Sequence, residues 1–189
     1  MRVIAGKARS LKLKTLDTME TRPTQDRTKE TLFNVLQPML ADCRFLDLFS
    51  GSEGIGIEAL SRGASHAVFV ERNPKAVACI EENLRFTKLA SDAKVYRGDV
   101  MTILSQLEGR ACFDMIFMDP PYNQLLEKQA LIFLAKSSLI HRDTVIIVEA
   151  SLQTDFSYLK ELGLEAYKYK KYKTNQHVFI QMTDEDVQK

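Results

Sequence analysis

Asp119, Pro120, Pro121 and Tyr122 form a stretch whose residue types could do chemistry together. They follow the apolar run 115–118, which is typical of a strand buried on both faces of a parallel sheet. Proline fixes φ and lacks an N–H group, so two in succession end a strand and stiffen the backbone. Ligands of open α/β sheets bind where strands have their carboxyl ends. We therefore expect a carboxylate, a carbonyl and a ring at a ligand-binding edge.

Such an edge suits methyl transfer to an exocyclic amine of a nucleobase. That amine is a poor nucleophile, because its lone pair is delocalised into the ring. The Asp119 carboxylate and the Pro120 carbonyl could accept its two hydrogens and stabilise the positive charge that develops on nitrogen. Tyr122 could stack on the base, which is worth roughly 1–3 kcal/mol. The alternative is that these residues only form a turn that ends the strand.

A second candidate site is a glycine-containing loop at residues 50–56, between a predicted strand at 45–49 and a helix that ends near Gly63. Strand, glycine loop and helix begin a dinucleotide-like βαβ unit. The glycines are Gly51, Gly54 and Gly56. Their spacing is not that of nicotinamide binders, and no Lys-Ser/Thr follows as in a P-loop. Asp47 and Glu53 add negative charge, which suits a ligand with an ammonium and a sulfonium, S-adenosyl-L-methionine.

Two further strand ends carry acids that could bind this cofactor. Glu71 ends the predicted strand 67–70 at the offset from Gly51 where an acid reaches ribose hydroxyls. Alternatively, it caps the next helix. Asp99 follows the predicted strand 93–96 and could accept a hydrogen bond from the adenine amine, with Val100 packed on the ring. Asp99 would also serve as the N-cap of a helix at 101–107.

Arg22 and Thr24 lie in a predicted loop before a helix at about 26–36. They could close over a bound cofactor, or only cap the helix, with Thr24 as its N-cap residue.

Two local basic segments favour RNA binding. Such local segments are needed because a net charge of +1 gives the whole protein no attraction to RNA. The sequence of the amino-terminal arm predicts a small hairpin or an extended segment. Its cations could bind RNA phosphates, or the arm could simply be solvated. The candidate RNA-binding residues are Arg2, Lys7, Arg9 and Lys12. The segment 167–173 alternates aromatic residues with lysines, including Lys170 and Lys171. It suits RNA contact, or is an edge strand protected by lysines.

The composition of the 189 residues, 45% apolar and 27% charged, predicts one globular domain. Three cysteines without metal-ligand spacing predict reduced thiols, no metal and a cytoplasmic protein. No apolar run reaches membrane-spanning length and no signal peptide is recognisable, so no membrane association is expected. The three histidines are scattered and are assigned no chemistry, and Asn83 is interpreted as a helix surface residue.

Together these motifs resemble the RsmD-like family of bacterial methyltransferases, which modify guanine N2 in small-subunit ribosomal RNA. The matching segments are RVIAG at 2–6, RPTxDRxxETLFN at 22–34, DLFSGS at 47–52, GIEALSRGA at 56–64 and DPPY at 119–122. The combination is more specific than any one motif, since general adenine-N6 enzymes share only the last.

The resemblance implies a Rossmann-like, doubly wound, seven-stranded α/β sheet, mostly parallel with one antiparallel strand. The arm at 1–20 would precede a methyltransferase domain at 21–183 and a frayed tail at 184–189. It also implies S-adenosylmethionine at the glycine loop, Glu71 on the ribose and Asp99 near adenine. The target would be guanine 966 of 16S ribosomal RNA, flipped out of its stack in an assembled 30S particle by a monomeric enzyme. Glu53 departs from the glycine that is usual in the family.

Other functions remain compatible with these residues. The edge motif equally permits adenine-N6 methylation of DNA or RNA, although so short a chain has no obvious target-recognition domain. A ribosome-assembly factor could bind RNA and cofactor without turnover. A nicotinamide oxidoreductase is disfavoured by the glycine spacing.

Overall fold

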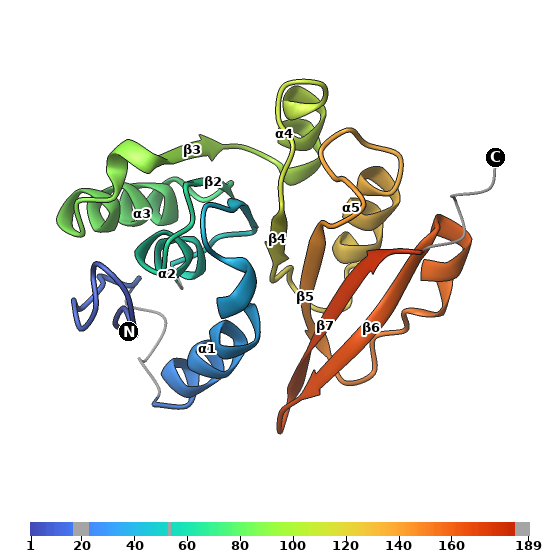
Figure 1. Cartoon of the computed structure of the whole chain (residues 1–189), viewed down its shortest axis with the longest axis horizontal. Coiled ribbons are helices and arrows are strands. Elements are labelled where there is room, and N and C mark those ends of the chain that lie inside the picture. The colour runs from blue at the N-terminus through green and yellow to red at the C-terminus, as the bar shows by residue number, and fades with distance from the viewer. Residues whose placement is uncertain (17–22, 53, 184–189) are drawn as a thin grey trace. The chain divides into compact units, whose positions relative to one another are not determined.

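The computed structural model describes residues 1–16, 23–52 and 54–183, with side chains from residue 26 onward in the first helix (Figure 1). The predicted seven-stranded, mostly parallel α/β sheet is confirmed. The chain divides into two compact units, residues 1–100 and 101–189, and each is described by itself.

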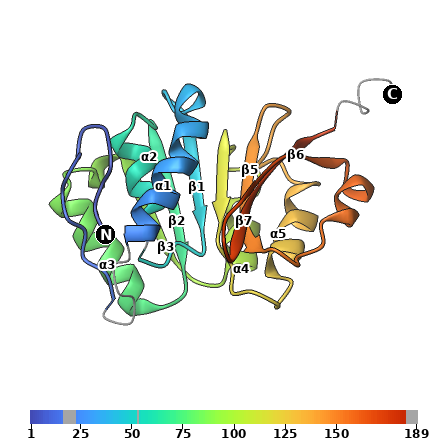
Figure 2. The ribbon, with the colours of Figure 1, turned by 90° about the horizontal axis from the view of Figure 1, so that it is seen from below.

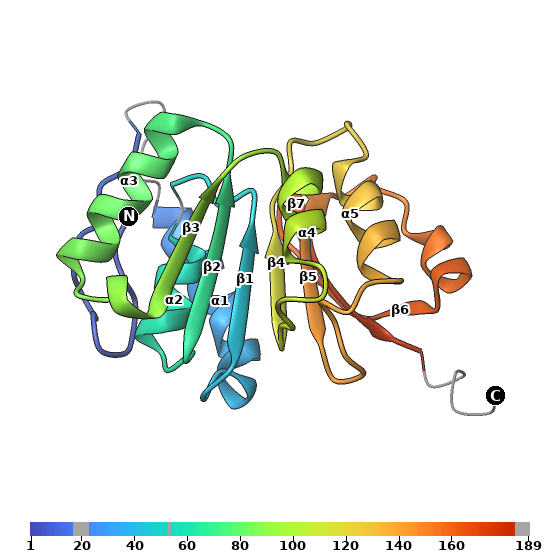
Figure 3. The same ribbon diagram turned by 90° about the horizontal axis from the view of Figure 1, so that it is seen from above.

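The first unit contains three parallel strands in the order β3-β2-β1, namely β1 (Arg44–Leu48), β2 (His66–Glu71) and β3 (Ala93–Arg97). The helices are α1 (Pro23–Leu36), α2 (Ile55–Ser61) and α3 (Pro74–Phe86), with short 3-10 turns at Gln37–Met39 and Ala90–Asp92. Helices α1 and α2 lie against the same face of β1 and β2 (Figures 2 and 3). Strand β1 is buried from Phe45 to Leu48, and this stretch is apolar except for Asp47.

The amino-terminal arm, residues 1–14, folds as a small hairpin on this unit, with an isolated antiparallel bridge between Arg2 and Lys12. Several of its apolar side chains are buried, among them Val3, Ala8 and Leu13. The buried Glu58 carboxylate accepts the N–H groups of Ile4 at 2.8 Å and of Ala5 at 3.0 Å. The arm is therefore an ordered part of the fold.

Asn83 is the second anchor of the arm. Its side chain is 3% exposed, accepts the Lys14 N–H at 2.9 Å and donates to the Lys14 carbonyl at 2.9 Å. The interpretation of Asn83 as a helix surface residue was wrong, because the arm covers that position of α3. A buried amide that exchanges two hydrogen bonds with one backbone unit fixes a strand as a neighbouring strand would.

The second unit contributes strands in the order β4-β5-β7-β6, namely β4 (Met115–Met118), β5 (Val145–Ser151), β6 (Leu164–Lys171) and β7 (Asn175–Met182). Helix α4 (Val100–Leu107) precedes β4, and α5 (Leu126–Leu134) lies between β4 and β5. Strands β4 and β5 are parallel, while β7 is antiparallel to both β5 and β6. The predicted single antiparallel strand is thus β7.

The predicted start of the first helix was wrong. Helix α1 begins at Pro23, three residues earlier than expected, because proline is well suited to a first helical turn. Thr24 therefore lies inside the helix and cannot be its N-cap residue. Residues Ser157–Leu162 form a short 3-10 helix. None of the helices described here combines the length and apolar character needed to cross a bilayer.

Candidate active site

The glycine loop after β1 is held by Asp47, whose side chain is buried. Its Oδ2 atom accepts the N–H of Gly56 at 2.8 Å, at the start of α2. Ser50 Oγ donates to the Asp47 carbonyl at 2.7 Å and accepts the Val70 N–H at 3.1 Å, which ties the loop to β2. The first acid of the motif therefore fixes the shape of the loop.

The three positions of the loop that hold glycine require it for different structural reasons. A Cβ on Gly56 would lie 2.4 Å from the Phe69 ring, and one on Gly54 would lie 2.6 Å from Leu13 Cδ1 in the arm. A Cβ on Gly51 would meet only the Phe49 carbonyl, at 3.8 Å. Gly54 and Gly56 thus permit packing within the protein, whereas Gly51 leaves backbone that a ligand can approach closely.

The loop also contains a strained residue. Phe49 has φ of 60°, in the left-handed region that a bulky side chain rarely adopts. Gly51 follows with φ of 53°. Backbone strain of this kind costs about 1–3 kcal/mol and concentrates at ligand-binding and catalytic sites.

Glu71 lies at the end of β2, beside the glycine loop. Its Oε2 atom accepts the Gly51 N–H at 2.9 Å, and its Oε1 atom accepts the Asn73 N–H at 2.7 Å. The N-cap of α3 is Asn73, which accepts the Lys75 N–H at 2.9 Å. Asn73 is therefore the N-cap residue, while the Glu71 carboxylate binds both the Asn73 amide before the helix and the Gly51 amide of the loop.

Asp99 and Val100 follow β3 at the same edge. The Gly98 N–H donates to the Glu71 carbonyl at 3.0 Å, so the ends of β2 and β3 are joined beside the loop. Asp99 is exposed and immediately precedes α4, while Val100 is buried as its first residue. Gly51, Glu71 and Asp99 thus come from three successive strand ends of one parallel sheet, as predicted.

Three remaining cofactor candidates are not defined by the structure. Arg22 and Glu53 lie outside the described residues, and Thr24 is placed only as backbone within α1. Their proposed contacts with a cofactor remain predictions.

In the second unit, Asp119 to Tyr122 follow β4 directly, as predicted. Pro120 is buried and Asp119 is half-buried, while Tyr122 is 43% exposed. The register pairs Met118 with Val148, so the next residues along the two parallel strands are Asp119 and Glu149. Both acids lie close enough to Tyr122 to raise the pKa of its hydroxyl.

Tyr122 is held beside these acids as a neutral phenol. Its hydroxyl donates to Glu149 Oε1 at 3.5 Å. Burial, followed by the negative charges of Glu149 and Asp119, raises the pKa of Tyr122 well above its usual value. The phenol therefore stays uncharged at physiological pH, and 43% of the residue is exposed.

Sequence reasoning missed a cluster next to this edge, formed by Glu149, Tyr172, Asn175 and His177. His177 Nε2 lies 2.9 Å from Glu149 Oε2, and its Nδ1 lies 3.1 Å from the Tyr172 hydroxyl. Asn175 Nδ2 donates to Glu149 Oε1. The assignment of no chemistry to the histidines overlooked the 1% exposure of His177. A usable signal existed, since Glu149 follows the apolar run 145–148 as Asp119 follows 115–118.

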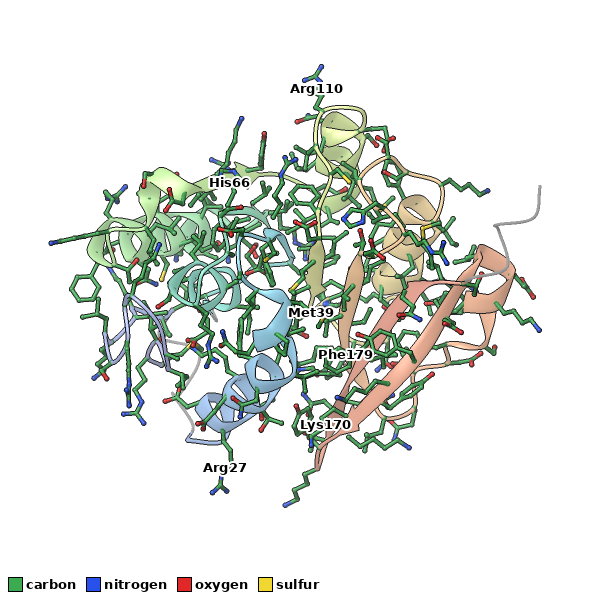
Figure 4. All side chains as sticks on the ribbon, in the orientation of Figure 1. Arg27, Met39, His66, Arg110, Lys170 and Phe179 are labelled. Atoms are coloured by element: carbon green, nitrogen blue, oxygen red, sulfur yellow. The ribbon has the colours of Figure 1, made fainter. Side chains whose placement is uncertain are left out.

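The cations predicted to bind RNA are exposed in both units. Arg2, Lys7, Arg9 and Lys12 project from the arm of the first unit. Lys170 and Lys171 are exposed on β6 of the second, and Lys170 lies near the joined end of the β6–β7 hairpin (Figure 4). Among residues with a described placement, no group of three or more His, Cys, Asp or Glu could hold a metal ion.

Comparison with known proteins identifies the family. The model of the family described as Conserved hypothetical protein 95 matches residues 1–181. The Bacillus subtilis protein YlbH is 41% identical over 150 residues, covering 79% of this chain and 82% of the relative. Ribosomal RNA small subunit methyltransferase D of Haemophilus influenzae is 37% identical over 150 residues, covering 79% and 78%.

The structural comparison agrees with the sequence comparison. The solved structure of Escherichia coli yhhF has a TM-score of 0.83 at 28% identity, covering 97% of this chain and 98% of that one. The chain therefore belongs to the Conserved hypothetical protein 95 family and is an RsmD-like, S-adenosylmethionine-dependent methyltransferase with a Rossmann-like fold.

Proposed function

We propose that this protein methylates the exocyclic N2 of a guanine in 16S ribosomal RNA, and that this guanine is guanine 966. The observation that carries the proposal is the edge after β4, where a half-buried carboxylate precedes a buried proline and an exposed, neutral tyrosine. Relatives in H. influenzae and E. coli are named Ribosomal RNA small subunit methyltransferase D, which supports an RNA substrate.

The first unit has residues that fit S-adenosylmethionine, whose sulfonium supplies an electrophilic methyl group. Gly51 allows close approach of the backbone, and the Glu71 carboxylate beside it suits ribose hydroxyls. Asp99 is exposed for the adenine amine, with Val100 next to it. Asp47 would act indirectly, because its buried carboxylate shapes the loop. Arg22, which precedes α1, and Thr24, in the first turn of α1, would cover the cofactor.

The second unit has residues that fit the target base. The Asp119 carboxylate and the Pro120 carbonyl would accept the two N2 hydrogens and align the nitrogen lone pair with the methyl group. They would also stabilise the positive charge that grows on N2 as the bond forms. No strong base is needed, because the amine becomes acidic only as the methyl group arrives. Tyr122 would stack on the flipped guanine.

The two basic segments would bind phosphates of the RNA. In the arm, buried contacts hold the backbone while the cations point outward, so binding costs little further ordering of the chain. Lys170 and Lys171 sit on an exposed strand between tyrosines, a composition that suits RNA. The same proposal includes an assembled 30S particle as the substrate and a monomer as the active form of the enzyme.

The test is methyl transfer from labelled S-adenosylmethionine to 30S particles that lack the modification, with naked 16S RNA and DNA as parallel substrates. Nucleoside mass spectrometry of the product should show N2-methylguanine, and mapping should place it at position 966. N6-methyladenine would instead establish the adenine-specific reaction. Cofactor binding with no label in any substrate would favour a non-enzymatic assembly factor.

A further inference from the structure

A row of polar residues crosses three strands of the second unit at one level. Strand pairing places Glu149 of β5 opposite His177 of β7, and His177 opposite Lys170 of β6. On the other side of β5, the register of β4 brings Asp119 to the level of Glu149. The row therefore runs from the exposed basic strand to the carboxylate proposed to hold the target amine.

His177 connects the members of this row by hydrogen bonds. A neutral imidazole has one donor and one acceptor nitrogen. The carboxylate of Glu149 can only accept, so Nε2–H donates to Glu149 Oε2, 2.9 Å away. Nδ1 then accepts from the Tyr172 hydroxyl at 3.1 Å. Burial raises the pKa of Tyr172 to about 12, so its hydroxyl remains a donor at neutral pH.

Glu149 links this series of hydrogen bonds to Tyr122 in the candidate site. Its Oε2 atom is held by His177, while Oε1 accepts from Asn175 and, at 3.5 Å, from the Tyr122 hydroxyl. The Phe117 ring of β4 packs edge-on against His177, with centroids 6.1 Å apart. The orientation of the Glu149 carboxylate is therefore fixed by contacts other than its hydrogen bond with Tyr122.

We propose that Glu149, His177 and Tyr172 are positioning residues that orient the Tyr122 ring for stacking on the target base. The inference rests on the proposed function, in which Tyr122 contacts the base and these three residues do not. A fixed hydroxyl at one end of the phenol restricts ring rotation and tilt, so less conformational freedom is lost when the base binds and reacts. Tyr172, His177 and Asn175 all belong to the β6–β7 hairpin, which also carries Lys170 and Lys171. The segment proposed to meet RNA thus orients Tyr122.

The test is a double-mutant cycle in the full-length protein. His177→Leu removes the donor to Glu149, and His177→Gln supplies an amide donor at a similar place. We expect His177→Leu to lower kcat about tenfold with little change in KM or cofactor affinity, and His177→Gln to recover most of that loss. In a Tyr122→Phe background the same change should cost less than about twofold, since residues acting through one another are not additive.

Tyr172→Phe removes only the hydroxyl at the far end of the hydrogen-bonded series. It replaces His177→Leu in the cycle if that variant does not fold. Tyr158→Phe is the matched control, because the Tyr158 hydroxyl is buried without a partner among the described residues. It should leave kcat unchanged. Losses that add in the Tyr122→Phe background would overturn the inference.

A readout without turnover separates this inference from the proposed function. In protein labelled with 13C at the tyrosine ring, the Tyr122 signal should move in His177→Leu and in Tyr172→Phe, and stay in place in Tyr158→Phe. An unmoved Tyr122 signal in both network variants would overturn the positioning role. If wild-type protein transfers no methyl group to RNA, the proposed function fails, and these signals alone decide whether the network orients Tyr122.

Discussion

Replacing Glu58 by glutamine should detach the amino-terminal arm and destabilise the first unit. The Glu58 carboxylate is fully buried in α2 and has four donors around it. Besides the Ile4 and Ala5 amides, Arg62 Nε lies at 2.7 Å and Lys29 Nζ at 3.5 Å, both with nearly buried side chains. A glutamine offers one acceptor oxygen and turns an NH2 group toward these donors, which leaves buried cations without a counter-charge.

Removing one partner of a buried ion pair costs roughly 3–5 kcal/mol, and for a chain of this size each kcal/mol lowers Tm by about 2–4 °C. We therefore expect Glu58→Gln to lower Tm by on the order of 6–20 °C. Urea unfolding gives the free energy, and hydrogen exchange at the Ile4 and Ala5 amides reports release of the arm. The arm should also lose affinity for RNA, since its cations would no longer be held together.

Glu82→Gln is the matched control. Glu82 accepts from Lys14 Nζ at 2.7 Å, so it also joins a helix to the arm, but both side chains are more than half exposed. Exposed pairs contribute about 0–1 kcal/mol. Equal destabilisation by the two substitutions, or a Glu58→Gln protein with the Tm and amide protection of wild type, would refute the assignment of the arm's stability to the buried carboxylate.

Three further predictions follow from single contacts. Asp119→Ala should keep cofactor affinity, measured by calorimetry, and lose on the order of a hundredfold in methyl transfer, because the positive charge on the amine is no longer stabilised; transfer at the wild-type rate would contradict its role. Gly56→Ala should lower the free energy of unfolding by about 1–3 kcal/mol in urea titration, since the new methyl group would lie 2.4 Å from the Phe69 ring. Burial raises the pKa of Tyr172 from 10.0 to about 12, so the folded state holds a proton that the unfolded chain has lost, and stability should fall as pH rises from about 10 to about 12. Tyr172→Phe should reduce that fall in thermal unfolding curves, and an unchanged slope would show that other groups cause it.

The elements and the edge residues were predictable because they depend on local sequence. The run 115–118 is a strand with the predicted bounds, since four apolar residues are followed by two prolines that cannot continue a ladder. The acids at the end of β2 and shortly after β3, Glu71 and Asp99, could be placed at one edge from topology alone, because parallel strands share their direction.

Partners distant in sequence could not be predicted from local pattern. Asn83 is polar within an amphipathic helix and therefore suggested solvent, but Lys14, 69 residues earlier, covers it. The glycines of the loop read as one ligand-binding motif, yet Gly54 and Gly56 make room for Leu13 and Phe69. In each case a tertiary contact, rather than the residue's own propensity, decides its role.

Burial separates two kinds of acid in this fold, which explains why residue type alone did not assign their roles. Asp47 and Glu58 are buried and give their oxygens to backbone amides of the loop and the arm, so they shape the protein. Glu71, Asp99 and Asp119 lie at strand ends with part of their side chains exposed, where a ligand can compete for them. Because a buried, hydrogen-bonded carboxylate loses those bonds if it turns toward a ligand, only the second group can exchange partners at modest cost. Substitution of the first group should therefore appear in unfolding curves, and substitution of the second in binding and transfer.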